Sequence, residues 1–509
     1  MTFKKLPLAA AAIAGLVASA TLPHDASAQV GAQIFALTDA YNASGWELFS
    51  SLSESPGNIV LSPYSIGSAM SMTLSGARGD TAQEMASVLK HSLSREEIDA
   101  ANGPVLATLS SYDRSAVPPT CPAGMQLTGG RCEANPDANG WCPFSTRREG
   151  DRCRGGATFP PSASLLVANA LMLLNSPSVS ADYAGLLKDK YAAEVFRNAS
   201  LADVNGWVAR KTNGKIDKIL DEAKADATSA VILSAVYFKS RWATPFDERR
   251  TQAEPFHISG TEQVMVSMMH QTGHYALVAR QGYRAIRLPY VIQSLALVVV
   301  LPNEIDGLND VMRGIDAKEQ SALLAAYRSD PPLARAVLTL PRFKIESDID
   351  LVPQFRKAAM QLAFDGNRAD FSGVTGSPPS SPRLVIGKIR HRATIEVAEE
   401  STEAAAVTAV EMPPGGAAAP PPGLPPEEFR VDHPFLFYLA DNATGAVLFA
   451  GRVASPPQLA GPVALQTQTA LPPVSVGPMQ SQRPSQGATQ RPAPLAPTDV
   501  APTPKSRPQ

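Results

Sequence analysis

Residues 391–419 read HRATIEVAEESTEAAAVTAVEMPPGGAAA, and this stretch decides how the chain is organised. Its first part alternates: Thr394 and Glu396 lie on one face and Ile395 and Val397 on the other, as in a strand with one buried face. Farther along, one face holds only small or apolar uncharged side chains, namely Thr402, Ala404, Ala406, Thr408 and Val410. Such a strand can enter between two neighbouring strands, because that face carries no charge to desolvate. The prolines at 413 and 414 end it, since proline donates no ladder hydrogen bond.

The stretch resembles the reactive-centre loop of the serpins. The residues that match the family's hinge are Glu399, Glu400, Thr402, Glu403, Ala404, Ala405, Ala406 and Thr408. Further matches follow in the family's order at 58–85 (NIVLSPYSIGSAMSMTLSGARGDTAQEM), 231–246 (VILSAVYFKSRWATPF), 267–278, 369–374 and 432–453. They cover most of Phe35–Pro456. The chain is therefore identified as a member of the serpin family, of a bacterial type that is exported.

The resemblance implies an α+β fold with three β-sheets, about eight to nine helices and an exposed reactive-centre loop. It also implies inhibition of serine proteases by suicide-substrate trapping. The protease cleaves the loop, forms a covalent acyl complex, and is carried along when the cleaved segment joins the large sheet. Serpin loop insertion is an established example of strand addition and of stored strain. The chain would then be no enzyme and would act as a monomer without a cofactor.

The alternative is a non-inhibitory serpin that works as a carrier, chaperone or binding module. Members of that kind tend to carry bulky, charged or proline residues in the hinge, whereas this chain keeps Thr402 and the alanines. One departure is Ser401, where inhibitors usually have glycine. Serine has less access to positive φ than glycine, so we expect insertion to be slower. The hinge as a whole favours inhibition.

The loop also indicates a class of target. The family's usual spacing places the scissile bond at Gly415-Gly416, and Ala417 and Ala418 follow directly. The sequence has no lysine or arginine between Arg392 and Arg430, which argues against a trypsin-like target. Small side chains favour an elastase-like or subtilisin-like protease with a shallow pocket.

By resemblance, a polar cluster beneath the opening sheet contains Ser62, Ser65 and His391, and Trp242 lies where the loop begins to insert. Core packing alone is the competing interpretation of His391 and of Trp242. Ser65 is in addition a candidate N-cap of the helix that follows Pro63. Ser234 stands where the family usually has asparagine, and we expect its shorter side chain to weaken the cluster.

All four cysteines lie in an insertion, 113–160, that the family does not normally carry. Its two halves repeat: the spacing of Cys121, Pro122, Gly129, Arg131 and Cys132 recurs in Cys142, Pro143, Gly150, Arg152 and Cys153. The repeat predicts one disulfide within each half, as an exported chain permits. A zinc site is the alternative, but the segment has no Cys-x-x-Cys pair and no histidine. Its arginines alternate with acidic residues, which favours a decorated loop or a docking site over a polyanion site.

The ends of the chain differ from its middle. Residues 1–28 are typical of a secretory signal, with an apolar core and Ala26-Ser27-Ala28 before the cleavage position, so we expect a periplasmic or extracellular protein. The serpin domain then spans 29–456 and opens with a helix from Ile34 to Ser53. The Pro-rich tail, 457–509, is predicted to be disordered. A net charge of -2 argues against a nucleic-acid partner, and no second long apolar run indicates a membrane span.

Overall fold

A computed structural model describes residues 23–54, 56–113, 121, 124–128, 131–142, 146–155, 163–174, 178–221, 229–329, 331–379, 383–399 and 425–459. The chain divides into two units, Met1–Leu459 and Ala460–Gln509, and all described residues belong to the first. Most of the predicted signal and of the predicted tail therefore lies outside the described part. The first helix begins at Pro23, well before the expected Ile34, so the predicted cleavage position after Ala28 falls inside this helix.

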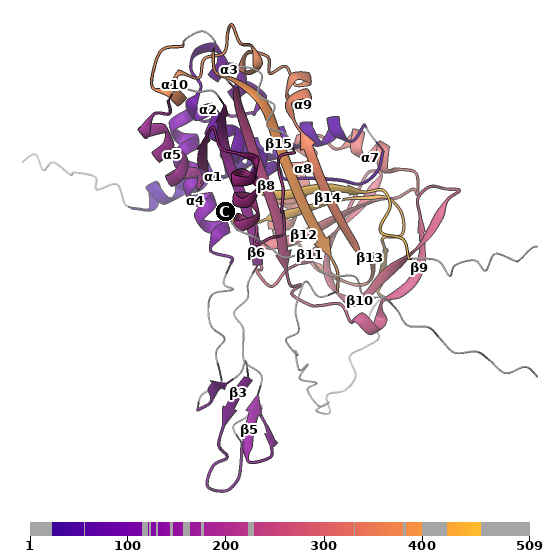
Figure 1. Ribbon diagram of the computed structural model, residues 1–509. Coiled ribbons are helices and arrows are strands. Elements are labelled where there is room, and N and C mark those ends of the chain that lie inside the picture. Colours follow the sequence, from indigo (N-terminus) through magenta and orange to yellow (C-terminus); the bar gives the residue numbers. More distant parts are fainter. Residues whose placement is uncertain are drawn as a thin grey trace, which may run out of the picture. The chain divides into compact units, whose positions relative to one another are not determined.

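A five-stranded sheet contains the strand that precedes the predicted loop. Its order is β14–β15–β8–β6–β7, formed by Phe343–Asp350, Val385–Val397, Ser229–Ser240, Ala163–Leu174 and Glu194–Arg197. Strand β15 lies between β14 and β8, pairing antiparallel with β14 and parallel with β8 (Figure 1). Almost every residue of β8 is buried, which explains its nearly unbroken apolar sequence.

A nine-stranded sheet packs behind it and holds most of the core. Its path β1–β18–β17–β12–β11–β10–β13–β16 is formed by Ile59–Leu61, Val447–Val453, Phe435–Asp441, Leu295–Pro302, Tyr283–Pro289, Gln263–Arg280, Leu333–Pro341 and Glu427–Arg430, and β9 (Gln252–His257) pairs with β10 off this path. Strand β12 is buried along its whole length, as its run of leucines and valines predicts. Strand β16, which follows the predicted loop, lies at the edge and pairs in parallel with β13.

The helices of the described part are α1 Pro23–Leu52, α2 Pro63–Gly76, α3 Gly79–Val88, α4 Arg95–Ser110, α5 Ala181–Tyr191, α6 Leu201–Lys211, α7 Leu308–Gly314, α8 Ala317–Arg328, α9 Val352–Lys357 and α10 Ser372–Thr375, with two 3₁₀ turns, Glu248–Arg250 and Leu362–Phe364. Helix α2 is buried on all sides and contacts β6 and β8 of one sheet and β18 of the other. The α+β class and the number of three sheets are confirmed, although one of the three belongs to the insertion. The described residues form ten α-helices where about eight to nine were expected.

The third sheet belongs to the cysteine-containing insertion between α4 and β6. Its order is β2–β3–β5–β4, formed by Gln126–Thr128, Arg131–Ala134, Arg152–Gly155 and Arg147–Glu149. Each repeat is one hairpin, and the hairpins join where Glu133 of the first faces Arg154 of the second. These two residues occupy equivalent repeat positions, and their opposite charges form an ion pair with Nε and Oε1 3.0 Å apart.

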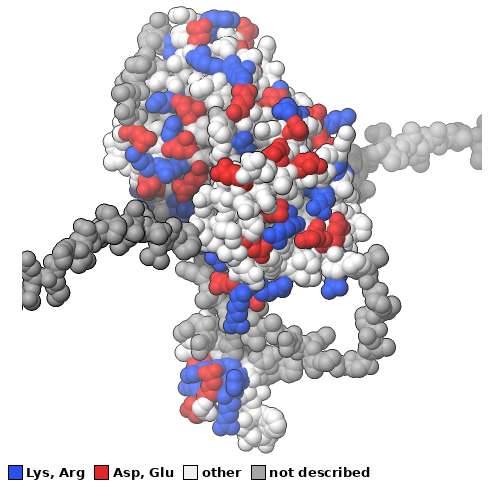
Figure 2. Space-filling model, turned by 90° about the vertical axis from the view of Figure 1, so that its right-hand side faces the viewer, with Lys and Arg blue, Asp and Glu red and all other residues white. Residues whose placement is uncertain are grey.

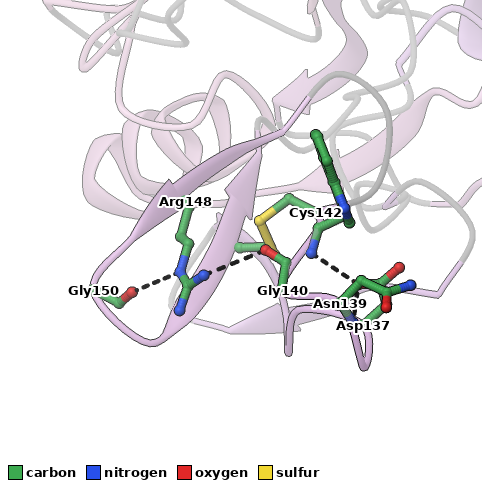
Figure 3. The surroundings of a disulfide bond; sticks show 8 residues. Asp137, Asn139, Gly140, Cys142, Arg148 and Gly150 are labelled. Carbon is green, nitrogen blue, oxygen red and sulfur yellow. Dashed lines mark hydrogen bonds between the residues drawn. A yellow bond between two sulfur atoms is a disulfide. The ribbon is translucent and has the colours of Figure 1, made fainter.

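Both predicted disulfides are confirmed: Cys121 is bonded to Cys132 and Cys142 to Cys153. The loop that precedes the second disulfide is closed by Asp137, whose Oδ1 accepts from the backbone N–H groups of Asn139 and Trp141 at 2.9 and 2.8 Å (Figure 3). Arg148 donates to the carbonyl oxygens of Gly140 and Gly150 and so ties this loop to the β4–β5 turn. The zinc alternative is excluded, because all four thiols are oxidised in pairs.

The surface carries charges of both signs. On the face in Figure 2, lysine and arginine side chains alternate with aspartate and glutamate side chains, with no broad area of one sign. Among the described residues no helix is both long enough and apolar enough to cross a membrane.

Candidate functional site

The junction between β15 and the predicted loop is fixed by the two residues that follow the strand. The Trp242 indole Nε1 donates to the Ala398 carbonyl oxygen at 2.8 Å, and the Phe246 amide donates to the Glu399 carbonyl oxygen at 3.3 Å. Trp242 is itself held by stacking on Tyr290, with ring centroids 4.4 Å apart. The two residues that follow β15 are therefore each held by a hydrogen bond to their backbone carbonyl oxygen.

The Glu399 side chain closes the same junction. The residue as a whole is only 1 % exposed, and its carboxylate accepts from the Arg342 guanidinium Nε at 2.5 Å and from the Thr251 hydroxyl. Arg342 lies between β13 and β14, and Thr251 directly precedes β9. One carboxylate thus ties the end of β15 to the connection between β13 and β14 and to the start of β9. We call Glu399, Arg342, Thr251 and Trp242 the junction cluster.

Strands β15 and β8 are paired directly with each other below this cluster. Ten residue pairs form the ladder, from Val385↔Ser229 to Ile395↔Phe238, with one irregularity between Ile386 and Lys388. Both strands run in the same direction. A segment that turned back after Glu399 and entered between them would be antiparallel to each.

A buried polar cluster crosses this ladder at its middle. His391 of β15 lies opposite Ser234 of β8, and their Nδ1 and Oγ atoms are 3.1 Å apart. Ser234 also reaches Ser65 Oγ at 2.8 Å, while the Ser62 amide donates to His391 Nε2 at 3.1 Å. These four side chains are 0–1 % exposed. The cluster therefore links β15, β8 and the start of α2.

The bonding pattern fixes the charge of His391. The Ser62 backbone N–H can only donate, so Nε2 must be the unprotonated nitrogen and Nδ1–H donates to Ser234. A second ring proton would break the bond to Ser62. Consistently, burial lowers the pKa of His391 to about 3. The imidazole is thus neutral in the folded protein.

The structure corrects the expected N-cap in this cluster and adds one residue to the cluster. The N-cap of α2 is Ser62, which accepts from the Ser65 amide at 3.0 Å, and not Ser65, because Pro63 already occupies the first helical position. The sequence reasoning also missed Asn169 of β6, which is 3 % exposed and accepts from Ser65 Oγ at 3.3 Å. It is the one polar residue in the apolar run 165–174 of β6, and this is the signal by which the sequence could have indicated it. Despite its short side chain, Ser234 lies within hydrogen-bond distance of both Ser65 and His391.

The remaining predicted residues fall in 400–424, which lies outside the described residues. These are the hinge residues Ser401, Thr402, Glu403, Ala404, Ala405, Ala406 and Thr408 and the candidate reactive bond Gly415, Gly416, Ala417 and Ala418. The described residues that the structure brings together are Ser62, Ser65, Ser234 and His391 in the polar cluster, and Trp242 with Glu399 at the junction.

After 400–424 the next described strand is β16. It pairs with β13 alone, and side-chain contacts add to this backbone ladder. Arg284 lies over the Phe429 ring at 5.3 Å and donates to the Glu428 carbonyl oxygen at 3.1 Å. The Arg430 guanidinium bonds Glu254 of β9 at 2.5 Å and Asp432 at 3.0 Å. The described residues before and after 400–424 are thus each held by an ion pair whose carboxylate is largely buried.

Known protein families, sequences and structures were compared with this chain. The family model described as "Serpin (serine protease inhibitor)" matches residues 39–128 and 150–456, leaving out the centre of the insertion. The chain is 30% identical to the human leukocyte elastase inhibitor over 433 residues, which is 82% of this chain and 99% of that protein. It is 31% identical to human Serpin B3 over 435 residues, with the same two shares. Its fold resembles the crystal structure of human thyroxine-binding globulin with a TM-score of 0.65 at 23% identity, covering 84% of this chain and 100% of that one.

Proposed function

Since the chain belongs to the serpin family, we propose that it inhibits an elastase-like or subtilisin-like serine protease by trapping it on the segment 400–424. The observation that carries the proposal is the parallel pair of β15 and β8, which leads directly into that segment through the junction cluster. A cleaved segment released after Glu399 would have a place to enter, antiparallel to both strands.

The exchange of hydrogen bonds favours insertion. Entry breaks one parallel ladder of ten residue pairs and makes two antiparallel ladders of similar length. The net gain is on the order of ten hydrogen bonds, each contributing about 0.5–1.5 kcal/mol. A segment such as 402–412 spans roughly 36 Å at about 3.3 Å per residue. The small uncharged face from Thr402 to Val410 can be buried without desolvating a charge.

In the proposed reaction the protease serine attacks the carbonyl carbon at the scissile bond and forms an acyl-enzyme, releasing the new amino terminus. Insertion then carries the acylated protease along the sheet before water can hydrolyse the ester. The new amino terminus remains attached to β16, and β16 remains paired with β13. No cofactor takes part in these steps.

The test is incubation of the full-length oxidised protein with a pancreatic-type elastase, followed by denaturing electrophoresis and mass mapping of the cleavage position. We expect a complex that survives boiling in detergent and a cut between Gly415 and Ala419. The Thr402→Arg variant should be cleaved without inhibiting, because insertion would bury an unpaired guanidinium.

Glu403→Arg is the matched control, because alternation places residue 403 on the opposite face of the inserted strand. We expect this variant to keep inhibiting. Cleavage without any stable complex in the unaltered protein would reject trapping and favour a carrier or binding module. Loss of inhibition in both variants would reject the assignment of the inward face.

We propose in addition that the protein is exported and acts as a monomer outside the cytoplasm. The signal-like residues 1–28 and the two disulfides support export, since disulfides persist in oxidising compartments. Protein recovered from the periplasm or medium should begin at Gln29. An intact Met1 on that material would contradict the proposal.

A further inference from the structure

The corner between β16 and β17 contains a histidine whose two ring nitrogens both face oxygen atoms. His433 is 7 % exposed. Its Nδ1 lies 2.9 Å from Asp432 Oδ1, and its Nε2 lies 2.9 Å from the carbonyl oxygen of Pro302 at the end of β12. A carbonyl oxygen and an ionised carboxylate can only accept hydrogen bonds. A neutral imidazole has a single N–H, so it would leave a lone pair pointing at one of these oxygens.

The carboxylate of Asp432 is ionised at this place. Its second oxygen, Oδ2, accepts from Arg430 Nε at 3.0 Å. Burial opposes the ionised form, but the bonds from His433 and Arg430 outweigh it and lower the pKa of Asp432. Asp432 is therefore an acceptor towards both Arg430 and His433 and does not itself supply the proton that the His433 contact needs.

We infer that His433 carries both ring protons in the folded protein and is a positioning residue for β16, the strand that follows the segment 400–424. The His433 cation holds Asp432 in place, and Asp432 in turn holds Arg430 of β16. The Asp432 carbonyl oxygen also accepts from the His257 amide at 2.7 Å, which fixes the corner against β9. Because β16 has only four residues and one ladder partner, these side-chain bonds carry much of its attachment.

The charged and titratable side chains around Asp432 and His433 form one connected network of hydrogen bonds and ion pairs. Arg430 bonds Glu254 of β9, and the other oxygen of Glu254 faces His270 Nε2 of β10 at 2.5 Å. His270 differs from His433 in its second contact, which is the Thr339 hydroxyl at 3.3 Å. A hydroxyl can donate as well as accept, so a neutral His270 satisfies both of its contacts. His270 therefore serves as an internal control.

The charge of His433 follows from its two contacts and stands independently of the proposed function. Its consequence for trapping rests on that function, because β16 holds the chain that follows the segment 400–424.

The first experiment is ¹⁵N NMR of full-length protein labelled at histidine, with the His433 signals identified by their absence in the His433→Gln variant. At pH 7 we expect both His433 ring nitrogens to show the shifts of protonated nitrogens, whereas His391 should show one bare nitrogen. A bare nitrogen on His433 at pH 7 would overturn the inference, whatever the outcome with elastase.

The second experiment is hydrogen exchange of the peptide that spans 425–433, measured by mass spectrometry at pH 7. His433→Gln should exchange about tenfold faster than the unaltered protein, as expected for one lost charge-assisted bond. His270→Gln should accelerate the exchange of this peptide less, because neither contact of His270 needs a second ring proton. An effect of His433→Gln no larger than that of His270→Gln would reject the positioning role.

Discussion

The junction cluster gives the sharpest prediction for the native state. Replacing Arg342 by alanine leaves the Glu399 carboxylate, whose side chain is 2 % exposed, with the Thr251 hydroxyl as its remaining partner in the cluster. Removing one member of a fully buried pair costs about 3–5 kcal/mol. The Arg342 side chain is 43 % exposed, so water screens the pair, and we expect a loss of about 1–3 kcal/mol in the free energy of unfolding.

Lys344→Ala is the matched control. Lys344 lies two residues away and pairs with Glu346, and both side chains are about half exposed (52 % and 48 %). An exposed pair of this kind contributes less than about 1 kcal/mol. Urea denaturation followed by tryptophan fluorescence measures both variants, since Trp242 belongs to the junction cluster.

The same substitution should also shorten the active lifetime. If the pair holds the sheet shut until insertion begins, its loss lowers the barrier by up to about 2 kcal/mol, which is roughly a 30-fold faster spontaneous loss of inhibition. Unfolding free energies for Arg342→Ala and Lys344→Ala that agree within about 0.5 kcal/mol would refute the reasoning. Destabilisation without a faster loss of inhibition would leave Arg342 a structural residue only.

Two further predictions concern the insertion and the response to acid. Replacing Cys121 and Cys132 together by serine should destabilise their own hairpin by about 2–3 kcal/mol and leave the melting temperature of the main body unchanged, measured by calorimetry; a main-body shift of several degrees would contradict this. Burial lowers the pKa of His391 to about 3 and that of His91 to about 4, so below about pH 6.5 the unfolded chain takes up protons that the native protein does not. The free energy of unfolding should therefore fall by about 1.4 kcal/mol per pH unit for each histidine between about pH 6.5 and 4, and His391→Gln should reduce the slope measured by urea denaturation, whereas an unchanged slope would refute this account of His391.

The sequence predicted features that depend on local pattern. The alternation from Thr394 to Val397 places these residues in β15, and the repeated spacing of the cysteines selects the observed disulfides among three pairings. Both signals are contained within short windows, where periodicity and spacing act directly.

The features that were missed depend on residues far apart in the chain. Arg342 and Glu399 are separated by 57 positions, and nothing near either residue indicates the other. Asn169 stands out in its apolar strand, but its partner Ser65 lies 104 residues away. The N-cap of α2 is Ser62 and not the expected Ser65, because Pro63 occupies the first helical position.

The central claim is that the cleaved segment becomes a strand of the five-stranded sheet, and the melting temperature of the cleaved protein tests it most directly. A net gain of on the order of ten hydrogen bonds should raise that temperature by about 5–15 °C, at roughly 1 °C per kcal/mol for a domain of this size. Thr402→Arg, cut at the same bond, should show no such rise. A cut between Gly415 and Ala419 that leaves the melting temperature of the unaltered protein unchanged would contradict the account.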